Sequence, residues 1–478
     1  MYRFIIGCDC DGVLTDLYTH NVRAGKETFR REPVDLNGYG VDEIYDVSDI
    51  HVVWRYTKAV GIFRRYCQTE PAREGALSVI NELSGQGFEF HLISARMFAD
   101  DRGILGYLSR SWLMGWLERN DFRFNSVQLC SEKLSPRDKL QACRKLGVDA
   151  MIEDRPDNAL YLAENGIHVL MFDAPYNSDI SHENITRVHS WEEIRQLLMS
   201  LPVPSEDGYS RLEREEIAEL TDEEKKNYFR LYQRHLQEAP FDSEKLLRGE
   251  GRFRRLYRLL KLPVRMFFCV KAFGKKNIPY QNGFIIICNH CDSFDQYRFG
   301  LAFGNRPFVG YAAKEIRDTF RGRLFDSTGL GIFIDRNSKE DKHNAAELMA
   351  VYVAHDKVSL IFPEGTRKNK TPEGRAKFQN RFKPGTAVLA QKTGAGILPV
   401  ACNAFGRRAL VRFGEMIYVS PTDDIAEKTA ETEAAVAKLS MENFEYYFSK
   451  KNNKDELERV RAQYKEYLAG KELTGNDK

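Results

Sequence analysis

A histidine and a carboxylate five residues apart, His290 and Asp295, are the most suggestive chemical pair in this 478-residue sequence. The apolar run 284–288 before them has the length and β-branched content of a buried strand, and Asn289 is of a type that ends strands and caps helices. Positions i and i+5 lie about 140° apart on a helix, so the two side chains cannot share a helical face. We therefore expect His290 in a loop and Asp295 in the first turns of the following helix, reaching back to the imidazole ring. Such a carboxylate fixes the tautomer of the ring and leaves the other nitrogen to accept a hydroxyl proton.

The pair alone is weak evidence, because a loop histidine beside an acid is more often only hydrogen-bonded. A second apolar run, 360–362, leads into a turn that carries Glu364, Gly365, Thr366 and Arg367. Arginine can donate two parallel hydrogen bonds to a phosphate, and glycine lets the backbone approach it. This turn therefore predicts a phosphate site.

Two more apolar runs complete the region, one at 331–334 that leads to Arg336 and one at 396–400. The four segments, in this order, resemble the glycerolipid acyltransferase family, best known from the 1-acylglycerol-3-phosphate acyltransferases, over roughly 265–420. The resemblance implies that His290 is the general base and Asp295 its orienting partner. It also implies that the phosphate of the acceptor is held by Arg336, Glu364, Gly365, Thr366 and Arg367. Lys314 falls where the family carries a basic residue and is a further candidate for substrate binding.

The chain departs from that family at one position. The family commonly has serine two residues after the histidine, where this chain has Asp292, with Ser293 one residue further on. The departure concerns the acyl acceptor and leaves the predicted base in place.

Two aspartates near the start of the chain, Asp9 and Asp11, directly follow an apolar run. Carboxylates at i and i+2 after a strand can converge on one cation, although an aspartate-rich surface turn is the commoner meaning of this pattern alone. Further apolar runs end at Ser94 and in the acidic pair 153–154, and Lys139 stands at the start of a helical stretch.

An acid-tipped strand, a serine-tipped strand, a lysine and a second acid-tipped strand, in this order, resemble the phosphatases of the haloacid dehalogenase superfamily, in particular its deoxyribonucleotidase-like branch. The resemblance covers about 1–200 and implies a Rossmann-like domain. By that likeness Asp9 is the nucleophile that becomes an aspartyl-phosphate, and Asp11 is the acid/base. The insert at about 17–75 is then a small helical cap that selects the substrate.

The same resemblance supplies the ligands of the phosphoryl group. Ser94 and Lys139 would hold it, with Lys133 as the second candidate for the lysine. Asp154 would bind Mg²⁺ together with Asp9 and the carbonyl of Asp11. This set is suitable because Mg²⁺ prefers a few carboxylates plus phosphate and water.

The length predicts two or three domains, and 42% hydrophobic with 29% charged residues is the composition of a soluble or peripheral globular protein. We expect an α/β fold in four parts: a phosphatase domain at 1–203, linker helices at 204–248, an acyltransferase domain at 249–422 and a charged helical tail at 423–478. Nine cysteines without paired metal spacing fit a reducing compartment. No run of about 18 uncharged apolar residues occurs, so no transmembrane helix is expected.

A basic stretch precedes the acyltransferase segments. Residues 251–276 contain nine Lys or Arg and no Asp or Glu, with aromatic and leucine residues at helical spacing. This predicts a basic amphipathic helix at 252–268 in a membrane interface, where anionic headgroups contribute about 1 kcal/mol per nearby basic residue. A packed helix with solvated arginines is the plainer alternative, and nothing else in the sequence favours nucleic acid. We expect a cytoplasmic protein that binds peripherally to anionic lipids on the inner face of the membrane.

Together these patterns predict acyl transfer from acyl-CoA or acyl carrier protein to a lysophospholipid hydroxyl, with 1-acylglycerol-3-phosphate as the expected acceptor and phosphatidate as the product. A Mg²⁺-dependent phosphatase accompanies it. A serine hydrolase is not favoured, because no Gly-x-Ser-x-Gly elbow surrounds a candidate serine. Two hypotheses stay open: a phosphatase of a nucleotide, small phosphate ester or lipid phosphate with the second domain as membrane anchor, and a non-catalytic membrane scaffold.

Overall fold

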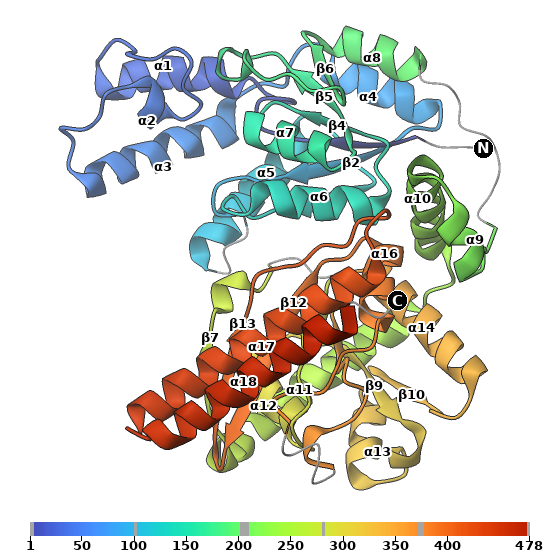
Figure 1. Cartoon of the computed structure of the whole chain (residues 1–478). Coiled ribbons are helices and arrows are strands. Elements are labelled where there is room, and N and C mark those ends of the chain that lie inside the picture. Colours follow the sequence, from blue (N-terminus) through green and yellow to red (C-terminus); the bar gives the residue numbers. More distant parts are fainter. Residues whose placement is uncertain (1–3, 100–102, 201–209, 280–282, 371–376, 476–478) are drawn as a thin grey trace. The chain divides into compact units, whose positions relative to one another are not determined.

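The protein is described by a computed structural model (Figure 1), which covers residues 4–99, 103–200, 210–279, 283–370 and 377–475. It divides into two compact units, Met1–Gly208 and Tyr209–Lys478. The first residues of the predicted linker, 204–209, lie outside the described residues.

The first unit is built on a six-stranded parallel sheet with the order β3-β2-β1-β4-β5-β6. Its strands are short and mostly apolar because helices cover both faces of the sheet. They are β1 (Ile5–Cys8), β2 (Glu89–Ser94), β3 (Ser126–Leu129), β4 (Ala150–Glu153), β5 (His168–Phe172) and β6 (Ile185–Val188). Since β1 lies between β2 and β4, the residues that follow these three strands meet at one edge, where parallel sheets bind their ligands.

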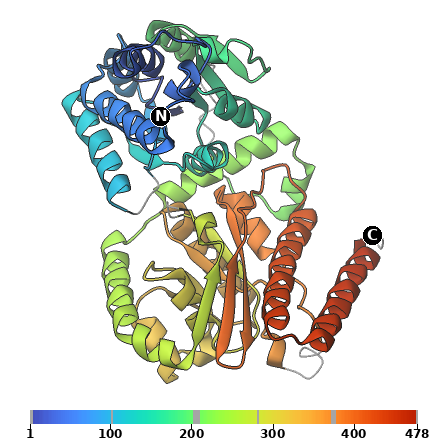
Figure 2. The same cartoon turned by 90° about the vertical axis from the view of Figure 1, so that its left-hand side faces the viewer.

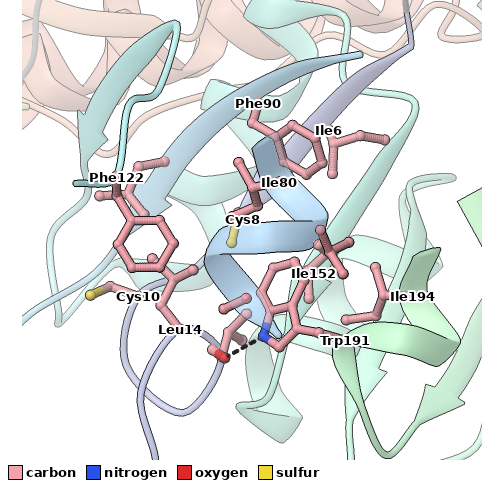
Figure 3. Packing of buried hydrophobic residues seen from close by; sticks show 14 of the residues in the cluster. Ile6, Cys8, Cys10, Leu14, Ile80, Phe90, Phe122, Ile152, Trp191 and Ile194 are labelled. Carbon is pink, nitrogen blue, oxygen red and sulfur yellow. Dashed lines mark hydrogen bonds between the residues drawn. The ribbon is translucent and has the colours of Figure 1, made fainter. Parts of the chain in front are cut away.

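Alternate residues of these strands enter two separate cores. Ile6 and Phe90 pack with Trp191 on one face (Figure 3), where the indole nitrogen of Trp191 donates to the Val13 carbonyl at 3.3 Å. Met151 and its neighbours pack on the other face. The helices around the sheet are α4 (Ala76–Gly85), α5 (Ile104–Arg119), α6 (Ser135–Leu146), α7 (Pro156–Glu164) and α8 (Trp191–Ser200).

The helical cap expected at about 17–75 is present and has a hydrophobic cluster of its own. It consists of α1 (Leu17–Phe29), α2 (Val41–Ile44) and α3 (Val52–Thr69). The prediction that Lys139 begins its helix is wrong, because α6 starts four residues earlier at Ser135. Pro136 stands in the first turn, where its missing N–H costs nothing.

The second unit is built on a seven-stranded mixed sheet with the order β10-β9-β11-β8-β12-β13-β7. β12 pairs with β13 in antiparallel fashion, and every other neighbouring pair is parallel. The strands are β7 (Cys269–Phe273), β8 (Ile285–Cys288), β9 (Val309–Ala313), β10 (Gly331–Ile334), β11 (Ser359–Ile361), β12 (Ile397–Phe405) and β13 (Arg408–Phe413). The fully buried β8 lies between β11 and β12, so the loop after it is flanked on both sides.

Helices pack on both faces of this sheet. They are α9 (Arg214–Glu219), α10 (Asp222–Glu238), α11 (Ser243–Phe267), α12 (Asp295–Phe303), α13 (Phe320–Ser327), α14 (Lys339–Ala354), α16 (Gly385–Thr393), α17 (Ile425–Lys450) and α18 (Lys454–Gly475). The described part of the predicted tail at 423–478 forms α17 and α18, which lie side by side, with α17 packed on β12 (Figure 2). Thr221 caps α10 through the expected capping box.

The basic helix predicted at 252–268 is longer than expected. α11 begins at Ser243, because the Asp242 side chain accepts a hydrogen bond from Lys245 N and caps it. Its first half is anchored within the unit, where a Cβ on Gly249 would lie 2.3 Å from the Thr328 carbonyl oxygen and Arg252 donates to the Ser327 carbonyl at 2.9 Å. In the part of the chain that the structure describes, no helix has both the length and the apolar character to cross a bilayer.

Candidate active sites

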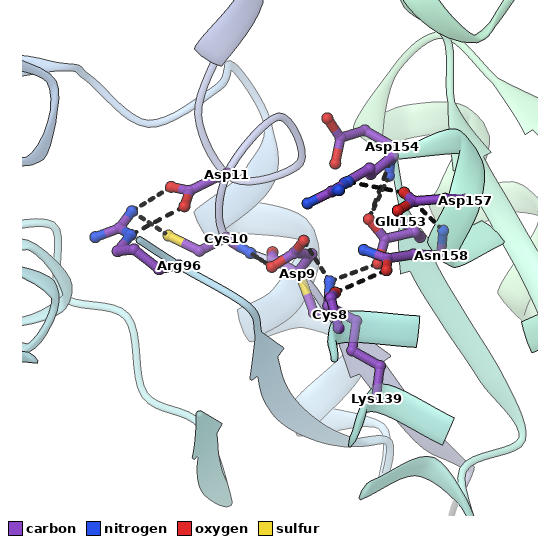
Figure 4. Close-up of polar contacts among 12 residues, drawn as sticks. Cys8, Asp9, Cys10, Asp11, Arg96, Lys139, Glu153, Asp154, Asp157 and Asn158 are labelled. Carbon is purple, nitrogen blue, oxygen red and sulfur yellow. Dashed lines mark hydrogen bonds and ion pairs between the residues drawn. The ribbon is translucent and has the colours of Figure 1, made fainter. Parts of the chain in front are cut away.

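The first site lies at the carboxyl edge of the parallel sheet, where Asp9 follows β1 (Figure 4). Lys139 Nζ lies 2.5 Å from Asp9 Oδ2 and 2.5 Å from Glu153 Oε2, and Asp9 Oδ1 accepts a hydrogen bond from Cys10 N at 2.7 Å. Lys139 and Glu153 are fully buried. Lys133, the second candidate, is exposed. The lysine therefore supplies the positive charge that Asp9 and Glu153 need in order to share a dry site.

This crowding of charges perturbs the acids. Burial raises the pKa of Asp9 to about 7; Lys139 opposes the rise, and Glu153 reinforces it. Burial, with Glu153 and Asp9 nearby, raises the pKa of Asp154 well above its usual range. Burial alone would lower the pKa of Lys139, but the two carboxylates outweigh it, and that pKa is raised. Strong shifts of this kind in a set of convergent groups are typical of functional sites.

Asp11 does not join this cluster. Its carboxylate points away from Asp9 toward Arg96 (Figure 4). Arg96 donates to both of its oxygens, from Nε to Oδ2 at 3.0 Å and from Nη2 to Oδ1. Tyr66, on the cap helix α3, donates to Oδ1 at 2.8 Å. The carboxylate of Asp11, the predicted acid/base, therefore pairs with the buried Arg96 in this structure and does not face Asp9.

The residues at this edge fit a Mg²⁺ ion. Ligand oxygens of Asp9, Glu153 and Asp154 all lie within 4.8 Å of one another. Asp154 Oδ1 is buried and has no hydrogen-bond partner among the described residues. Gly12, at φ 81°, lets Asp154 come this close, since a Cβ there would lie 1.8 Å from Asp154 Oδ2. The side-chain set thus contains Glu153, which the sequence analysis did not assign, in addition to Asp9 and Asp154.

Ser94, the last residue of β2, is the remaining predicted group of this site. Its hydroxyl oxygen is buried and has no hydrogen-bond partner within the described part of the chain. A buried hydroxyl normally has a partner, so this one has capacity for a ligand oxygen.

The second site lies at the carboxyl ends of β8, β11, β9 and β10, which are neighbours in the sheet. His290 lies in the loop after β8, and Asp295 is the first residue of α12, as predicted. His290 Nδ1 lies 3.0 Å from Asp295 Oδ2, and Asp295 is fully buried. The imidazole is 18% exposed and stacks on Phe362 with ring centroids 4.2 Å apart. Nδ1 is thereby occupied and Nε2 is the nitrogen left for a substrate.

Glu364 holds the backbone of the histidine loop. Its Oε1 accepts a hydrogen bond from His290 N at 2.7 Å, and its Oε2 accepts one from Asn380 N at 3.3 Å. The carbonyl of His290 accepts from Lys368 N at 2.7 Å. Burial raises the pKa of Glu364 to about 7, against the lowering effect of these amide bonds. The expected contact of Glu364 with phosphate stays a prediction, because both of its oxygens face backbone amides here.

Asn289 fixes the loop from the opposite side. It does not cap α12, whose N-cap is Phe294, so that expectation is wrong. Its side chain instead pairs with the backbone of Cys402 in β12, accepting from Cys402 N at 2.7 Å and donating to Cys402 O at 3.2 Å. A strand end pinned to its neighbour places the next residue, His290, in a defined position.

Asp292, the position where the family commonly has serine, pairs with Arg298. The Arg298 Nη1 atom lies 2.8 Å from each Asp292 oxygen and 3.3 Å from Asp295 Oδ1. Arg298 is itself buried. The aspartate therefore helps to compensate the charge of an arginine that also supports the orienting carboxylate.

The predicted phosphate ligands lie around the histidine loop and are mostly exposed. Lys314 follows β9, Arg336 follows β10, and Thr366 and Arg367 follow β11; all four side chains are exposed. Gly365 has φ 69°, and a Cβ there would lie 3.0 Å from Lys383 Nζ. The sheet brings these residues to one edge, while their contact with a phosphate stays a prediction.

Sequence reasoning missed four supporting residues: Glu153, Arg96, Lys368 and Arg298. Glu153 was visible as the last residue of an acid-tipped strand, but the sequence does not say which of two adjacent acids faces the lysine. Arg96 and Lys368 reach the sites through bonds to residues far away in the sequence, Asp11 and His290. Arg298 lies only three residues after Asp295, a helical spacing that could have indicated the pair.

Two family models match the chain. The model of the cytosolic type C 5′-(deoxy)nucleotidases of pyrimidines matches residues 3–202, and the acyltransferase model matches residues 269–403.

The curated relatives divide in the same way. A 1-acyl-sn-glycerol-3-phosphate acyltransferase of Borreliella burgdorferi is 34% identical over 152 residues, 30% of this chain and 57% of that protein. A nucleotidase of Clostridium acetobutylicum is 27% identical over 197 residues, 41% of this chain and 93% of that protein. The chain thus spans little more than half the length of the acyltransferase relative and nearly all of the nucleotidase.

Solved structures also resemble each part. The 1-acyl-sn-glycerophosphate acyltransferase of Thermotoga maritima is 22% identical, covering 48% of this chain and 85% of that one, with a TM-score of 0.31. A haloacid dehalogenase superfamily hydrolase of Geobacter sulfurreducens is 18% identical, covering 41% and 96%, with a TM-score of 0.30. By its two family matches and its relatives, this chain joins a domain that matches the type C 5′-nucleotidases to a domain that matches the acyltransferases, and the curated relatives of these two parts are named as a nucleotidase and as a 1-acyl-sn-glycerol-3-phosphate acyltransferase.

Proposed function

We propose that the second unit transfers an acyl group from acyl-CoA or acyl carrier protein to the free hydroxyl of 1-acylglycerol-3-phosphate, and that the first unit is a Mg²⁺-dependent phosphomonoesterase. The observation that carries the acyltransferase half is the His290–Asp295 pair at 3.0 Å in a loop clamped on both sides. A base held this firmly is suited to one proton transfer in a fixed direction.

In the acyl transfer, His290 Nε2 takes the proton of the acceptor hydroxyl as its oxygen attacks the thioester carbonyl. The new ester C–O bond forms, the C–S bond breaks, and the thiolate receives the proton. Asp295, fully buried, stabilises the imidazolium in between. Exposed cations around the loop, Lys314, Arg336 and Arg367 among them, suit the phosphate of the acceptor.

In the phosphatase, a carboxylate oxygen of Asp9 attacks phosphorus and the bond to the leaving oxygen breaks, which gives an aspartyl-phosphate. In this proposal Lys139 and the Ser94 hydroxyl hold the phosphoryl oxygens, which is supported by the unpartnered Ser94 hydroxyl and by the position of Lys139 beside Asp9. Asp11, once released from Arg96 and protonated from solvent, gives that proton to the leaving oxygen. It then takes a proton from the water whose oxygen attacks phosphorus, which breaks the bond between Asp9 and the phosphoryl group and releases inorganic phosphate. Mg²⁺, held by Asp9, Asp154 and Glu153 or the Asp11 carbonyl, would supply positive charge against the phosphate.

Membrane attachment through α11 is part of the proposal. Leu259, Leu262 and Met266 on its second half are 73%, 70% and 69% exposed. Phe268, just after the helix, contacts Phe294 beside the histidine loop with ring centroids 5.5 Å apart. A lipid substrate drawn from a bilayer at α11 would therefore reach the base over a short path.

The test uses the full-length protein and its own second site as control. Radiolabelled acyl-CoA or acyl carrier protein is supplied with lysophosphatidate and Mg²⁺ to wild type, His290→Ala and Asp9→Asn. We expect wild type and Asp9→Asn to form phosphatidate, and His290→Ala to form none. We expect wild type and His290→Ala to release phosphate from a phosphomonoester, and Asp9→Asn to release none. If wild type acylates no lysophospholipid, the acyltransferase assignment fails and the phosphatase becomes the principal activity.

Flotation with vesicles tests the membrane contact separately. Leu262→Glu combined with Met266→Glu should remove the contribution of α11 to membrane binding. The measurement is the fraction of full-length protein that floats with the vesicles, which should fall. Leu348→Glu, at a 42% exposed leucine on α14, is the matched control. Equal loss in both variants would contradict a specific role of α11.

A further inference from the structure

The tail helices α17 and α18 contact a chain segment that borders the histidine loop. The acyltransferase model matches the chain only as far as residue 403, so both helices lie beyond the matched part. The segment consists of residues 377–383, which form neither helix nor strand. Its backbone therefore needs hydrogen-bond partners from other parts of the fold.

The carboxylate of Glu433 on α17 lies at the centre of this contact and is 4% exposed. Its Oε2 accepts a hydrogen bond from Phe382 N at 2.8 Å, and its Oε1 accepts one from Arg381 Nη1 at 2.8 Å. Tyr467, a buried residue of α18, donates its hydroxyl to the same Oε1 at 2.5 Å. A carboxylate with donors on both oxygens is held in one orientation. Glu433 therefore fixes the backbone of the segment at Phe382.

Tyr467 holds the preceding residues of the segment. Its ring centroid lies 5.7 Å from that of Phe378, in a hydrophobic cluster to which both tail helices contribute. Gln379 Nε2 donates to the Tyr467 hydroxyl at 3.3 Å, and Arg381 Nη2 donates to the Tyr467 carbonyl at 3.2 Å. The segment is thus bound by one acid of α17 and one tyrosine of α18.

The same segment bonds the two residues that hold the backbone of His290. Asn380 N donates to Oε2 of Glu364 at 3.3 Å, and Oε1 of Glu364 accepts from His290 N at 2.7 Å. The Phe378 carbonyl accepts from Lys368 Nζ at 3.0 Å, and Lys368 N donates to the His290 carbonyl at 2.7 Å. Both the amide and the carbonyl of His290 are therefore connected to the segment through one intermediate residue each.

We propose that Glu433 is a positioning residue for acyl transfer, which holds the 377–383 segment and, through it, the backbone of His290. The inference rests on the proposed acyl transfer and assigns to it a residue outside the part that matches the family. A shift of the histidine loop moves Nε2 relative to the acceptor hydroxyl, and a misplacement of about 1 Å can cost about 100-fold in rate. The cations proposed for the phosphate, such as Lys314 and Arg336, follow other strands. The loss should therefore fall on kcat and not on KM.

The experiment compares the full-length wild type with Glu433→Gln in acyl transfer to lysophosphatidate. The amide nitrogen of glutamine cannot accept a hydrogen bond, so either Phe382 N or Arg381 loses its acceptor. We expect kcat to fall about 10-fold, with KM for both substrates within about 2-fold of wild type. Tyr467→Phe, which removes one donor to Glu433, should change kcat in the same direction by about 2- to 5-fold and serves if Glu433→Gln does not fold.

Leu457→Ala is the matched control for the stability of the tail. Leu457 is buried near the start of α18, about 15 Å along the helix from Tyr467. Its truncation should lower the urea midpoint at least as much as Glu433→Gln does, because it leaves a cavity, and kcat should stay unchanged. An equal loss of kcat in the two variants would assign the effect to tail packing and overturn the inference.

A double variant tests whether Glu433 acts through Glu364. Glutamine at 364 can still accept from His290 N but cannot accept from Asn380 N as well. Glu364→Gln/Glu433→Gln should therefore lose clearly less in kcat than the product of the two single losses. Losses that multiply would show that the two residues act independently and would overturn the inference.

Hydrogen exchange of the His290 amide, measured by mass spectrometry, needs no turnover. Exchange should be faster in Glu433→Gln than in wild type and unchanged in Leu457→Ala. Unchanged exchange in Glu433→Gln would overturn the inference. If wild type acylates no lysophospholipid, the proposed acyl transfer fails, while the exchange rate still decides whether Glu433 holds the histidine loop.

Discussion

The phosphatase site buries its reacting group among charges, whereas the acyltransferase site places its buried charge behind the reacting group. Asp9 is 6% exposed and shares Lys139 with Glu153, both fully buried. His290 is 18% exposed, and only its partner Asp295 is fully buried. The difference agrees with the two proposed reactions: phosphoryl transfer needs compensation of the charge around phosphorus, whereas acyl transfer needs one oriented base, and in the proposal the charged substrate meets exposed cations.

Removal of Mg²⁺ should have the largest effect, because it should abolish the activity of one site and leave that of the other. Chelation with EDTA should reduce phosphate release to background, because Asp9, Glu153 and Asp154 then repel a phosphate. Acyl transfer by the same preparation should be unchanged. A parallel loss of both activities would contradict the assignment of Mg²⁺ to the first site alone. Phosphate release that returns when Mg²⁺ is added back would show that chelation has not damaged the protein.

Asp295→Asn tests the buried charge behind the base. The amide cannot hold the imidazole in the same tautomer or stabilise the imidazolium, so kcat for acyl transfer should fall by roughly 10³-fold or more with KM little changed. Asp292→Asn is the matched variant, since Asp292 pairs with Arg298 and not with the ring. A smaller effect at Asp295 than at Asp292 would refute the orienting role.

Glu364→Gln tests whether the raised pKa of Glu364 lowers the free energy of unfolding at neutral pH. The folded-state pKa of about 7 exceeds the model-peptide value of 4.5, so the folded protein binds the extra proton between these pH values. The free energy of unfolding of wild type should therefore fall as the pH rises through this window, by up to about 3 kcal/mol. Urea unfolding at pH 5 and pH 8 should show a smaller loss in Glu364→Gln than in wild type, because Asp9 and Asp154, whose pKa values are also raised, remain in both. The exposed Glu219→Gln should behave as wild type. Parallel pH curves for wild type and Glu364→Gln would contradict it.

Phe362→Leu should have the smallest effect. Loss of the ring contact at 4.2 Å lets the imidazole move without removing a charge, so kcat should fall by about 2- to 10-fold. The phosphatase activity serves as the internal control. A loss as large as that of Asp295→Asn would mean that stacking, and not the carboxylate, orients the base.

The strand-end residues of both sites could be predicted from the sequence because parallel strands bring their carboxyl ends together whatever surrounds them. His290 and Asp295 could be placed on either side of a helix start for a different reason. Residues five apart cannot share one face of a helix, so the two side chains can meet only if His290 lies before the helix. The orientation of Asp11 could not be predicted, because it depends on Arg96 and Tyr66, which are 85 and 55 residues distant. The predicted start of α6 is wrong although Pro136 is a local signal for the first turn of a helix. The pairing of the Asn289 side chain with β12 could not be predicted, because it leaves no trace in the local sequence pattern.

The anchoring of α11 has a mechanical consequence. The helix has 25 residues, a rod about 37 Å long. Its first half is fastened to the body of the unit by the close approach of Gly249 to Thr328, the Arg252 hydrogen bond and the ion pair of Glu250 with Lys357 at 2.9 Å. The turns before Pro263 continue the fastened half directly, so a surface that binds Leu259 and Leu262 would restrict the tilt of the whole unit. The angle at which the histidine loop faces that surface is then built into the fold.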